Sequence, residues 1–219
     1  MTSLLDIIGG TVIGGLILLV ALTATDRGTT DFFNFNSDAI VQNNLARMAY
    51  ITEHDLRKMG FGIHEMQQAT ILQIATPQHL KFLSQLNYQT DVIADTIEYT
   101  IVPDDTIAYE DTSLVMYKVW RTVKISGQQP STLMIGKIGN PEVFRYLDQI
   151  GNPVEIMQAT KMVEVTMVAF NPRVVLSPEL VCAQINAMEG KELRKKELTR
   201  LLRPSFWRQT RLVSKNLRR

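Results

Sequence analysis

The chain has 219 residues, of which 45% are hydrophobic and 21% are charged, and this length allows one domain of ordinary size with a tail. Its single cysteine, Cys182, excludes an intramolecular disulfide, so the fold must depend on its core. The net charge of +1 hides an asymmetry: residues 191–219 carry eleven Lys and Arg against two Glu, and residues 1–190 carry twelve against twenty acidic side chains. Regions of opposite sign either attract each other within the fold or bind an outside partner, such as nucleic acid, a lipid headgroup or an acidic protein.

The first segment of the chain is built for a bilayer. Residues 4–23 are apolar or glycine except for Asp6, Thr11 and Thr23, and about twenty such residues suffice for a helix to cross the hydrocarbon core. A secretory signal peptide begins with basic residues, whereas no Lys or Arg precedes Arg27 here. Residues 1–25 are therefore predicted to form a retained transmembrane helix that contacts lipid through residues 4–23.

Four glycines interrupt this segment. Gly10 and Gly14 form a G-x-x-x-G pair that Gly9 and Gly15 widen, and small residues of this kind let membrane helices approach closely. The plainer interpretation is that glycine is common in membrane helices. Each glycine also weakens a helix by about 1 kcal/mol relative to alanine, so bending or partial unwinding is left open.

Asp6 is the residue that a simple anchor does not need. A carboxylate in a bilayer is costly and usually has a partner. Asp6 either sits at the level of the headgroups or pairs with a cation, and the nearest cation is an α-amino group, its own or that of a neighbouring copy.

Residues 26–60 are interpreted as an amphipathic continuation of this helical spine. Ser37 is a good N-cap, Gly60 is a plausible stop, and residues 25–36 between the anchor and Ser37 either break the helix or continue it. His54 beside Asp55 is a weak catalytic pair, because adjacent helical residues point to different faces. One apolar face is predicted from residues at helical spacing: Val41, Leu45, Met48, Thr52, Leu56 and Met59.

Beyond Gly62 the pattern changes to short β-like runs, at residues 70–76, 79–86, 95–102, 113–125, 142–154 and 161–170, with a last run from residue 206. The first two are separated only by Pro77 and Gln78 and predict a hairpin. Alternation in residues 97–101 and 163–167 predicts an antiparallel sheet with one buried face. The fold class is therefore α+β, with residues 61–219 forming a β-sheet domain laid against the helix.

Residues 177–204 fit this sheet least well. They are predicted to be one or two helices inserted before the last strand, with a solvated basic face.

Motifs for catalysis or cofactor binding are not found: the sequence lacks H-E-x-x-H, C-x-x-C, G-x-S-x-G and the phosphate-binding G-x-x-x-x-G-K. His54, His64 and His79 lack metal-ligand spacing. No cofactor and no enzyme activity are predicted. One acidic cluster is a weak calcium candidate and is otherwise a solvated turn: Asp104, Asp105, Glu110 and Asp111.

Read from Thr2, the start resembles the mature N-terminus of type IV pilins and pseudopilins. Residues 3–6 fall on that family's Thr-aliphatic-aliphatic-Glu positions, with Asp6 in place of Glu, whereas Thr2 replaces the usual Phe and only Met1 stands where a leader would be. The resemblance implies that Asp6 neutralises the N-terminal amine of an adjacent subunit. The residues it assigns to subunit assembly are Thr2, Asp6, Gly9, Gly10, Gly14 and Gly15.

A narrower resemblance is to the PilW and J-type minor subunits, which carry D-L-R-x-A-G-[FY] at the end of their long helix. Asp55, Leu56, Arg57, Gly60 and Phe61 occupy those positions, with Met59 in place of Ala; Gly60 lets the chain leave the helix, and Phe61 can pack back on it. Their sheets also contain an F-x-Y-x-D-x-x-G block, matched here by Phe144, Tyr146, Asp148 and Gly151.

This resemblance implies a pilin-like fold and a structural minor subunit of a type IV pilus or type II secretion pseudopilus, single-pass in the inner membrane with a periplasmic C-terminal domain. The expected partners are other pilin-like subunits and the membrane assembly machinery. The alternative is a lone membrane-anchored domain that binds an anion, and a third interpretation, DNA uptake, makes nucleic acid the ligand. The candidate anion-binding residues are Arg203, Arg208, Arg211, Lys215, Arg218 and Arg219.

Overall fold

The computed structural model describes residues 2–63, 71–86, 94–109, 112–170, 174, 178–201 and 206–213. The chain divides into two compact units, Met1–Ile40 and Val41–Arg219. The first is helical throughout its described residues, and the second contains the rest of that helix together with all of the described strands.

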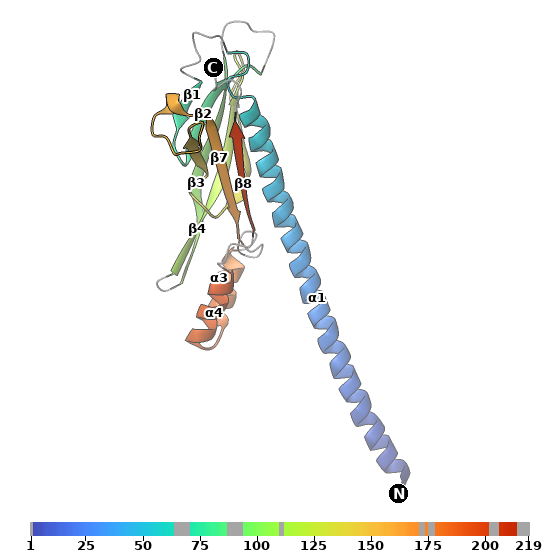
Figure 1. Cartoon of the computed structure of the whole chain (residues 1–219). Coiled ribbons are helices and arrows are strands. Elements are labelled where there is room, and N and C mark those ends of the chain that lie inside the picture. Colours follow the sequence, from blue (N-terminus) through green and yellow to red (C-terminus); the bar gives the residue numbers. More distant parts are fainter. Residues whose placement is uncertain are drawn as a thin grey trace. The chain divides into compact units, whose positions relative to one another are not determined.

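The helix α1 runs without a break from Thr2 to Arg57 (Figure 1). Residues 25–36 therefore continue the helix and do not break it, and the glycines cause no unwinding. The expected N-cap at Ser37 is wrong, because Ser37 lies inside the helix. The predicted stop is confirmed: α1 ends three residues before Gly60, whose φ of 70° suits a residue without a side chain.

The predicted apolar face of α1 is buried in the second unit. Its six members are all between 1% and 5% exposed. The one polar member, Thr52, is satisfied within the helix, since its hydroxyl donates to the carbonyl of Met48 at 2.9 Å. The face packs on both sheets, so α1 supplies one side of the main core.

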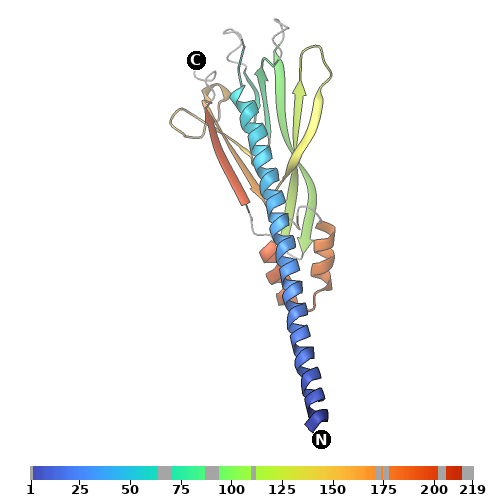
Figure 2. The same ribbon diagram turned by 90° about the vertical axis from the view of Figure 1, so that its right-hand side faces the viewer.

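Strands β1 (Leu72–Ala75), β2 (His79–Ser84), β3 (Asp95–Tyr109), β4 (Thr112–Lys124) and β5 (Ser131–Ile138) form an antiparallel sheet in that order. Strands β6 (Phe144–Leu147), β7 (Met162–Ala169) and β8 (Phe206–Val213) form a second antiparallel sheet. Figure 2 shows the upper part of α1 against both sheets.

The expected single sheet is two sheets, and β5 was not anticipated. Strand β3 continues past Val102, whereas only Phe144–Leu147 of the expected run at 142–154 is an extended strand. The hairpin over Pro77 and Gln78 is confirmed.

The two sheets meet where the chain leaves β5. The Gly139 N–H donates to the carbonyl of Val168 at 2.8 Å, and the Asn140 amide bonds the backbone of both Thr166 and Val168. A Cβ at Gly139 would collide with the ring of Phe170. The segment after β5 therefore crosses from one sheet to the other and continues as β6.

The helical insertion is confirmed as α3 (Pro178–Ala187) and α4 (Lys191–Leu201). Its apolar residues do not join the main core. Val181, Ile185, Leu198 and Leu201 pack with Met116 of β4 and with Phe170 in a second, smaller core. A short 3₁₀ turn, η2 (Met157–Ala159), lies in the connection between β6 and β7.

Candidate functional site

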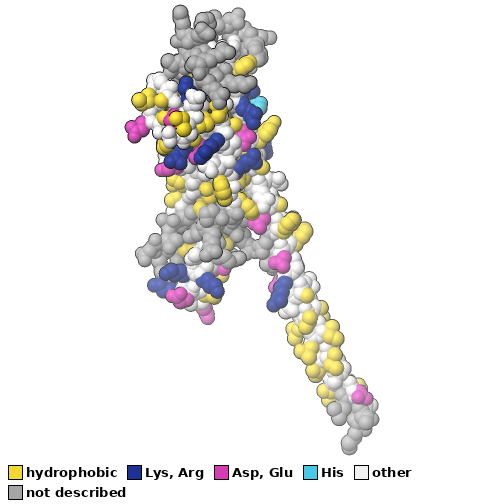
Figure 3. Space-filling view, in the orientation of Figure 1, with side chains coloured by type: hydrophobic (Ala, Val, Ile, Leu, Met, Phe, Trp, Pro, Cys, Tyr) yellow, Lys and Arg dark blue, Asp and Glu magenta, His cyan; other side chains and the backbone are white. Residues whose placement is uncertain are grey.

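The first part of α1 exposes apolar side chains on every face. Residues 16–20 are between 58% and 68% exposed, and five consecutive residues cover more than one helical turn. Among the described residues one helix, α1, is long enough and apolar enough to cross a membrane. Figure 3 shows these hydrophobic side chains along the lower part of α1. A helix that is apolar all round is typical of lipid or of packing among other helices.

The polar side chains of this segment are largely satisfied by their own helix. The hydroxyls of Thr11, Thr23, Thr25 and Thr29 each donate to a carbonyl three or four residues back, at 2.7–3.0 Å. This arrangement suits hydrocarbon, where backbone and side-chain donors must be paired internally. Asp6 is exposed, so its carboxylate is accessible to another chain.

The glycines of this segment lie open. A Cβ at Gly9, Gly10, Gly14 or Gly15 would meet nothing within 4 Å. No contact within the described chain therefore requires these residues to be glycine. The side chain of Thr2 lies outside the described residues.

The structure gives Asp55 a clear role. Its buried carboxylate accepts a hydrogen bond from the Tyr99 hydroxyl at 2.5 Å and two from Arg121, from Nε at 2.5 Å and from Nη2 at 3.0 Å. These partners come from β3 and β4, so Asp55 ties the end of α1 to the middle of the larger sheet. Burial, and then the Asp55 charge, raise the pKa of Tyr99 well above its ordinary value, and the hydrogen bonds to Asp55 raise the pKa of Arg121.

The other residues of this helix-end motif divide by burial. Leu56 is 1% exposed and Gly60 makes the turn, whereas Arg57 is exposed. The side chain of Phe61 is 43% exposed and so is partly covered. The turn around Gly60 is fixed by a backbone bond from the Gly60 N–H to the Leu83 carbonyl and by one from the Gln85 N–H to the Phe61 carbonyl.

The F-x-Y-x-D-x-x-G block is a strand followed by a tight turn. Phe144 and Tyr146 are buried in β6, while one oxygen of Asp148 accepts hydrogen bonds from the N–H groups of Ile150, Gly151 and Asn152 at 2.7–2.8 Å. These bonds, led by that of Asn152, lower the pKa of Asp148. Gly151 has a φ of 100°, which explains why glycine stands there.

The first two residues of the acidic cluster do not lie in the expected turn. Asp104 and Asp105 lie within β3, where a bulge between Pro103 and Thr106 shifts the register with β4. Lysines occupy both carboxylates: Asp104 pairs with Lys118 at 2.5 Å and with Lys137 at 2.7 Å, and Asp105 pairs with Lys137 at 2.8 Å. Glu110 and Asp111 lie outside the described residues. Among the described residues, no group of three His, Cys, Asp or Glu is placed to hold a metal ion.

Two of the candidate anion-binding arginines have partners in the fold. Arg208 of β8 bonds Glu53 of α1 at 3.3 Å, and Arg211 bonds the buried Glu164 of β7 at 2.5 Å. Burial works against the charge of Glu164, but the hydrogen bonds from Arg211 and Gln209 outweigh it and lower its pKa. The remaining candidates, Arg203, Lys215, Arg218 and Arg219, lie outside the described residues.

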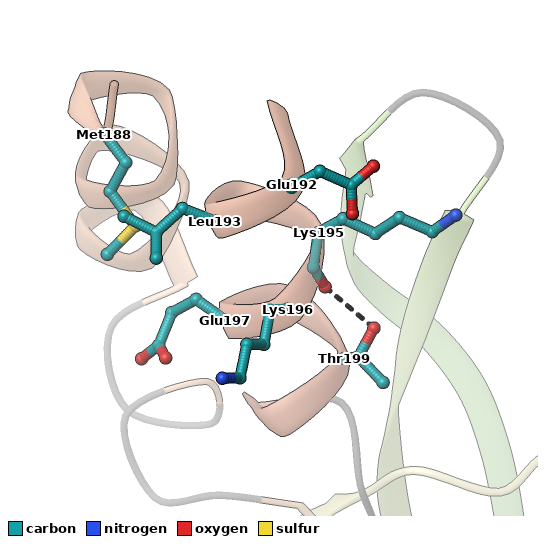
Figure 4. A pocket seen from close by; sticks show the side chains of 7 residues that line it. All are labelled: Met188, Glu192, Leu193, Lys195, Lys196, Glu197 and Thr199. Carbon is teal, nitrogen blue, oxygen red and sulfur yellow. Dashed lines mark hydrogen bonds between the residues drawn. The ribbon is translucent and has the colours of Figure 1, made fainter. Parts of the chain in front are cut away.

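A hollow of about 890 Å³ lies beside α4 (Figure 4). Its walls carry both signs of charge on a solvated helix, and its hydroxyl, Thr199, already donates to the carbonyl of Lys195 at 2.7 Å. This mixture gives no single ligand chemistry. The lining residues are Met188, Glu192, Leu193, Lys195, Lys196, Glu197 and Thr199.

Sequence reasoning missed Tyr99 and Arg121 as the partners of Asp55. A signal existed, because Arg121 shares the inward side of β4 with the buried Val119. A cation at an inward position requires an acid opposite it.

Comparison with protein-family models, curated proteins and solved structures gave no match.

Proposed function

We propose that the chain is a pilin-like minor subunit of a type IV pilus or a type II secretion pseudopilus. The observation that supports this proposal best is the difference in exposure between the two parts of α1. One unbroken helix exposes apolar side chains all round in its first part and buries a single stripe under the two sheets in its last part. The work proposed for such a chain is packing with other subunits, and not turnover of a substrate.

In this proposal Asp6 pairs with the N-terminal amine of a neighbouring subunit and sets its position in the assembly. The cost of holding a carboxylate near hydrocarbon is offset by that amine. The open glycine face of residues 9–15 docks the adjacent helices. The chain waits in the inner membrane through residues 4–23, with the sheet domain on the periplasmic side.

The alternative of a lone anchored domain with a basic anion-binding end is less well supported. Arg208 and Arg211 already pair with Glu53 and Glu164, so an anion would have to compete with two carboxylates. Such a domain also has no use for Asp6. DNA uptake rests on the same arginines and shares this weakness; a salt-dependent, sequence-independent affinity for DNA would be its sign.

The proposal predicts a charge requirement at Asp6. Asp6→Asn should reduce recovery of the chain in assembled complexes by about tenfold, the effect of roughly 1.4 kcal/mol of lost pairing, whereas Asp6→Glu should retain assembly. Asp31→Asn, an exposed aspartate in the same helix, is the matched control and should have no effect. The measurement is the assembled fraction after mild detergent extraction, at equal membrane levels of each variant. Equal recovery of Asp6→Asn and the wild type would remove the amine pairing from the proposal.

The test of the function itself is to extract the full chain from its native membranes in mild detergent and to identify every chain that co-purifies. Several partners with an acidic residue near the start of an apolar helix would support a filament subunit. Recovery of the chain without such partners would contradict the proposal and favour the anchored binding domain.

A further inference from the structure

The free edges of the two sheets differ in how they are protected. Strands β1 and β6 have only four residues each, and β8 carries Arg208 and Arg211. Short strands and charged side chains are the usual means by which proteins prevent an edge from pairing with another chain. The fourth edge, β5, has eight residues, and its first half, residues 131–134, is exposed and contains neither a charge nor a proline.

The two halves of β5 have different surroundings. The second half carries Lys137, which is tied to Asp104 and Asp105, and ends where Gly139 bonds β7. Within the described residues, the backbone of residues 131–134 pairs only with β4. This half of the edge therefore presents unpaired N–H and C=O groups.

A groove runs between this half-edge and α1. It has a volume of about 270 Å³, below the range of roughly 300–1,000 Å³ for drug-sized ligands. Tyr50 and His54 stack on its helix side with their ring centroids 6.3 Å apart, and Leu133, which is 57% exposed, lies on its strand side. The floor is closed by Asp55 and Arg121, whose charges satisfy each other. The walls therefore suit uncharged side chains on an extended backbone.

The rim of the groove is basic. Arg47, Tyr50, His54 and Arg57 recur at intervals of three and four, so they share one exposed stripe of α1. Lys124 is exposed at the end of β4, next to the start of the free half of β5. A second copy of this chain would bring the same cations against these, which disfavours pairing of β5 with itself.

We propose that the free half of β5 and this helix stripe accept an extended strand from a different polypeptide, uncharged and apolar at its centre and acidic on its flanks. The strand adds to β5 through backbone hydrogen bonds, and alternate side chains enter the groove. Its acidic flanks meet Arg47 at one end and Arg57 and Lys124 at the other. The proposal makes no use of Asp6 or of the membrane segment, so it holds or fails separately from the filament role.

The experiment uses the full chain in detergent micelles and two labelled synthetic peptides. Both contain alternating valine and threonine, one with glutamates at its ends and the other with lysines. Fluorescence anisotropy measures binding, and hydrogen exchange measures protection of the amides of residues 131–134. We expect the glutamate peptide to bind more tightly than the lysine peptide, by a factor of about ten or greater. It should also protect these amides from exchange.

Three variants sharpen the result. Leu133→Lys places a charge on the edge and should weaken binding of the glutamate peptide by about tenfold or more. Trp207→Lys, an exposed apolar residue on the charged edge of β8, is the matched control and should bind like the wild type. Arg47→Glu combined with Arg57→Glu should reverse the preference between the peptides. Circular dichroism and thermal melting confirm that each variant is folded.

Three outcomes would overturn the proposal. One is equal binding of both peptides, and another is protection confined to residues outside 131–134. The third is self-association of the chain through β5, detected as a dimer that Leu133→Lys dissociates.

Discussion

Asp55 shows how one side chain can fix the relation of a helix to a sheet. Its carboxylate receives three hydrogen bonds from two strands while it is 2% exposed. A buried charge is tolerated only when it is paired and hydrogen-bonded. Because all of these bonds are directional, they set the rotation of α1 about its axis, which apolar packing alone leaves looser.

Removing this charge should destabilise the fold strongly. Asp55→Asn leaves Arg121 without its partner, and we expect a loss of about 2–3 kcal/mol in the free energy of unfolding, below the roughly 3–5 kcal/mol of a fully buried pair, because the Arg121 side chain is 26% exposed. Tyr99→Phe removes one hydrogen bond to a charged acceptor and should cost about 1.5 kcal/mol. Urea unfolding of the full chain in micelles measures both.

Asp31→Asn is the control for these variants, since it makes the same change at an exposed position of the same helix; we expect less than about 0.5 kcal/mol of change. A loss for Asp55→Asn no larger than for Asp31→Asn would contradict the tie between α1 and the sheet.

The group of Asp104, Lys118 and Lys137 predicts a pH dependence of stability. Burial disfavours the charge of Asp104, but hydrogen bonds from the two lysines outweigh it and lower its pKa, while hydrogen bonds to Asp104 and Asp105 raise the pKa of Lys137. On acidification through about pH 4, the ordinary range of an aspartate, the unfolded chain binds protons that the folded chain does not. Stability therefore falls as the pH drops toward the folded-state pKa.

The fall in stability at high pH arises from a raised pKa, and not from a lowered one. Lys137 contributes stability below the ordinary lysine pKa of about 10.4 and loses that contribution as the pH rises through its raised folded-state value. Melting temperature measured against pH checks both limbs. Asp104→Asn should lower the melting temperature at neutral pH and flatten its fall in acid, and an unchanged acid limb in this variant would contradict the assignment.

At the scale of elements, α1 and β5 approach each other closely at one point. A Cβ on Gly136 would collide with the sulfur of Met48, a buried member of the helix stripe. The absence of a side chain on β5 therefore makes room for a long one on α1.

This close contact gives a prediction with an internal check. Gly136→Ala should cost about 1–3 kcal/mol by overpacking, and Met48→Ala about 2–5 kcal/mol by leaving a cavity. In the double variant the new methyl group occupies space that Met48 vacates, so the combined loss should be smaller than the sum. Unfolding free energies of the four chains complete the cycle.

Gly28→Ala controls for the glycine change itself, because nothing lies within 4 Å of the added methyl. It should be neutral or slightly stabilising. Strictly additive losses for Gly136 and Met48 would mean that the two residues do not share this space.

At the scale of the whole chain, the charge asymmetry is used in part within the fold. The chain is acidic over residues 1–190 and basic over residues 191–219. Among the described residues, β8 links the two regions twice, through Arg208 to Glu53 and through Arg211 to Glu164. Attraction within the fold, one of the alternatives that the sequence allowed, therefore holds for these pairs.

Patterns with a local cause predicted the structure well. The 3.6-residue period identified six buried residues between Val41 and Met59, the glycine after them marked the turn, and Pro77 with Gln78 marked the first hairpin. The insertion was recognised because residues 177–204 lack alternation. Each of these signals arises within a few neighbouring residues.

Features that depend on distant contacts were not predicted. The sequence of β5 is a weak strand signal for two reasons. It contains Gly136, which leaves room for the side chain of Met48, and its N-terminal half is exposed. The split into two sheets is decided by Gly139 and Asn140, whose bonds go to β7. The ties of Asp55 to Tyr99 and Arg121 span 44 and 66 residues, so a short window of sequence contains only one partner.

The contact of α1 with β8 has a consequence for the order of folding. Glu53 and Arg208 are 155 residues apart, and β8 is the last of the described strands. The larger sheet can cover part of the α1 stripe as soon as β5 has left the ribosome or the translocation channel, but the side that faces β8 stays exposed to water until β8 has followed. Closing so distant a contact is slow, so the newly made chain spends this interval with an unfinished core, and it is then that chaperones and proteases compete for it.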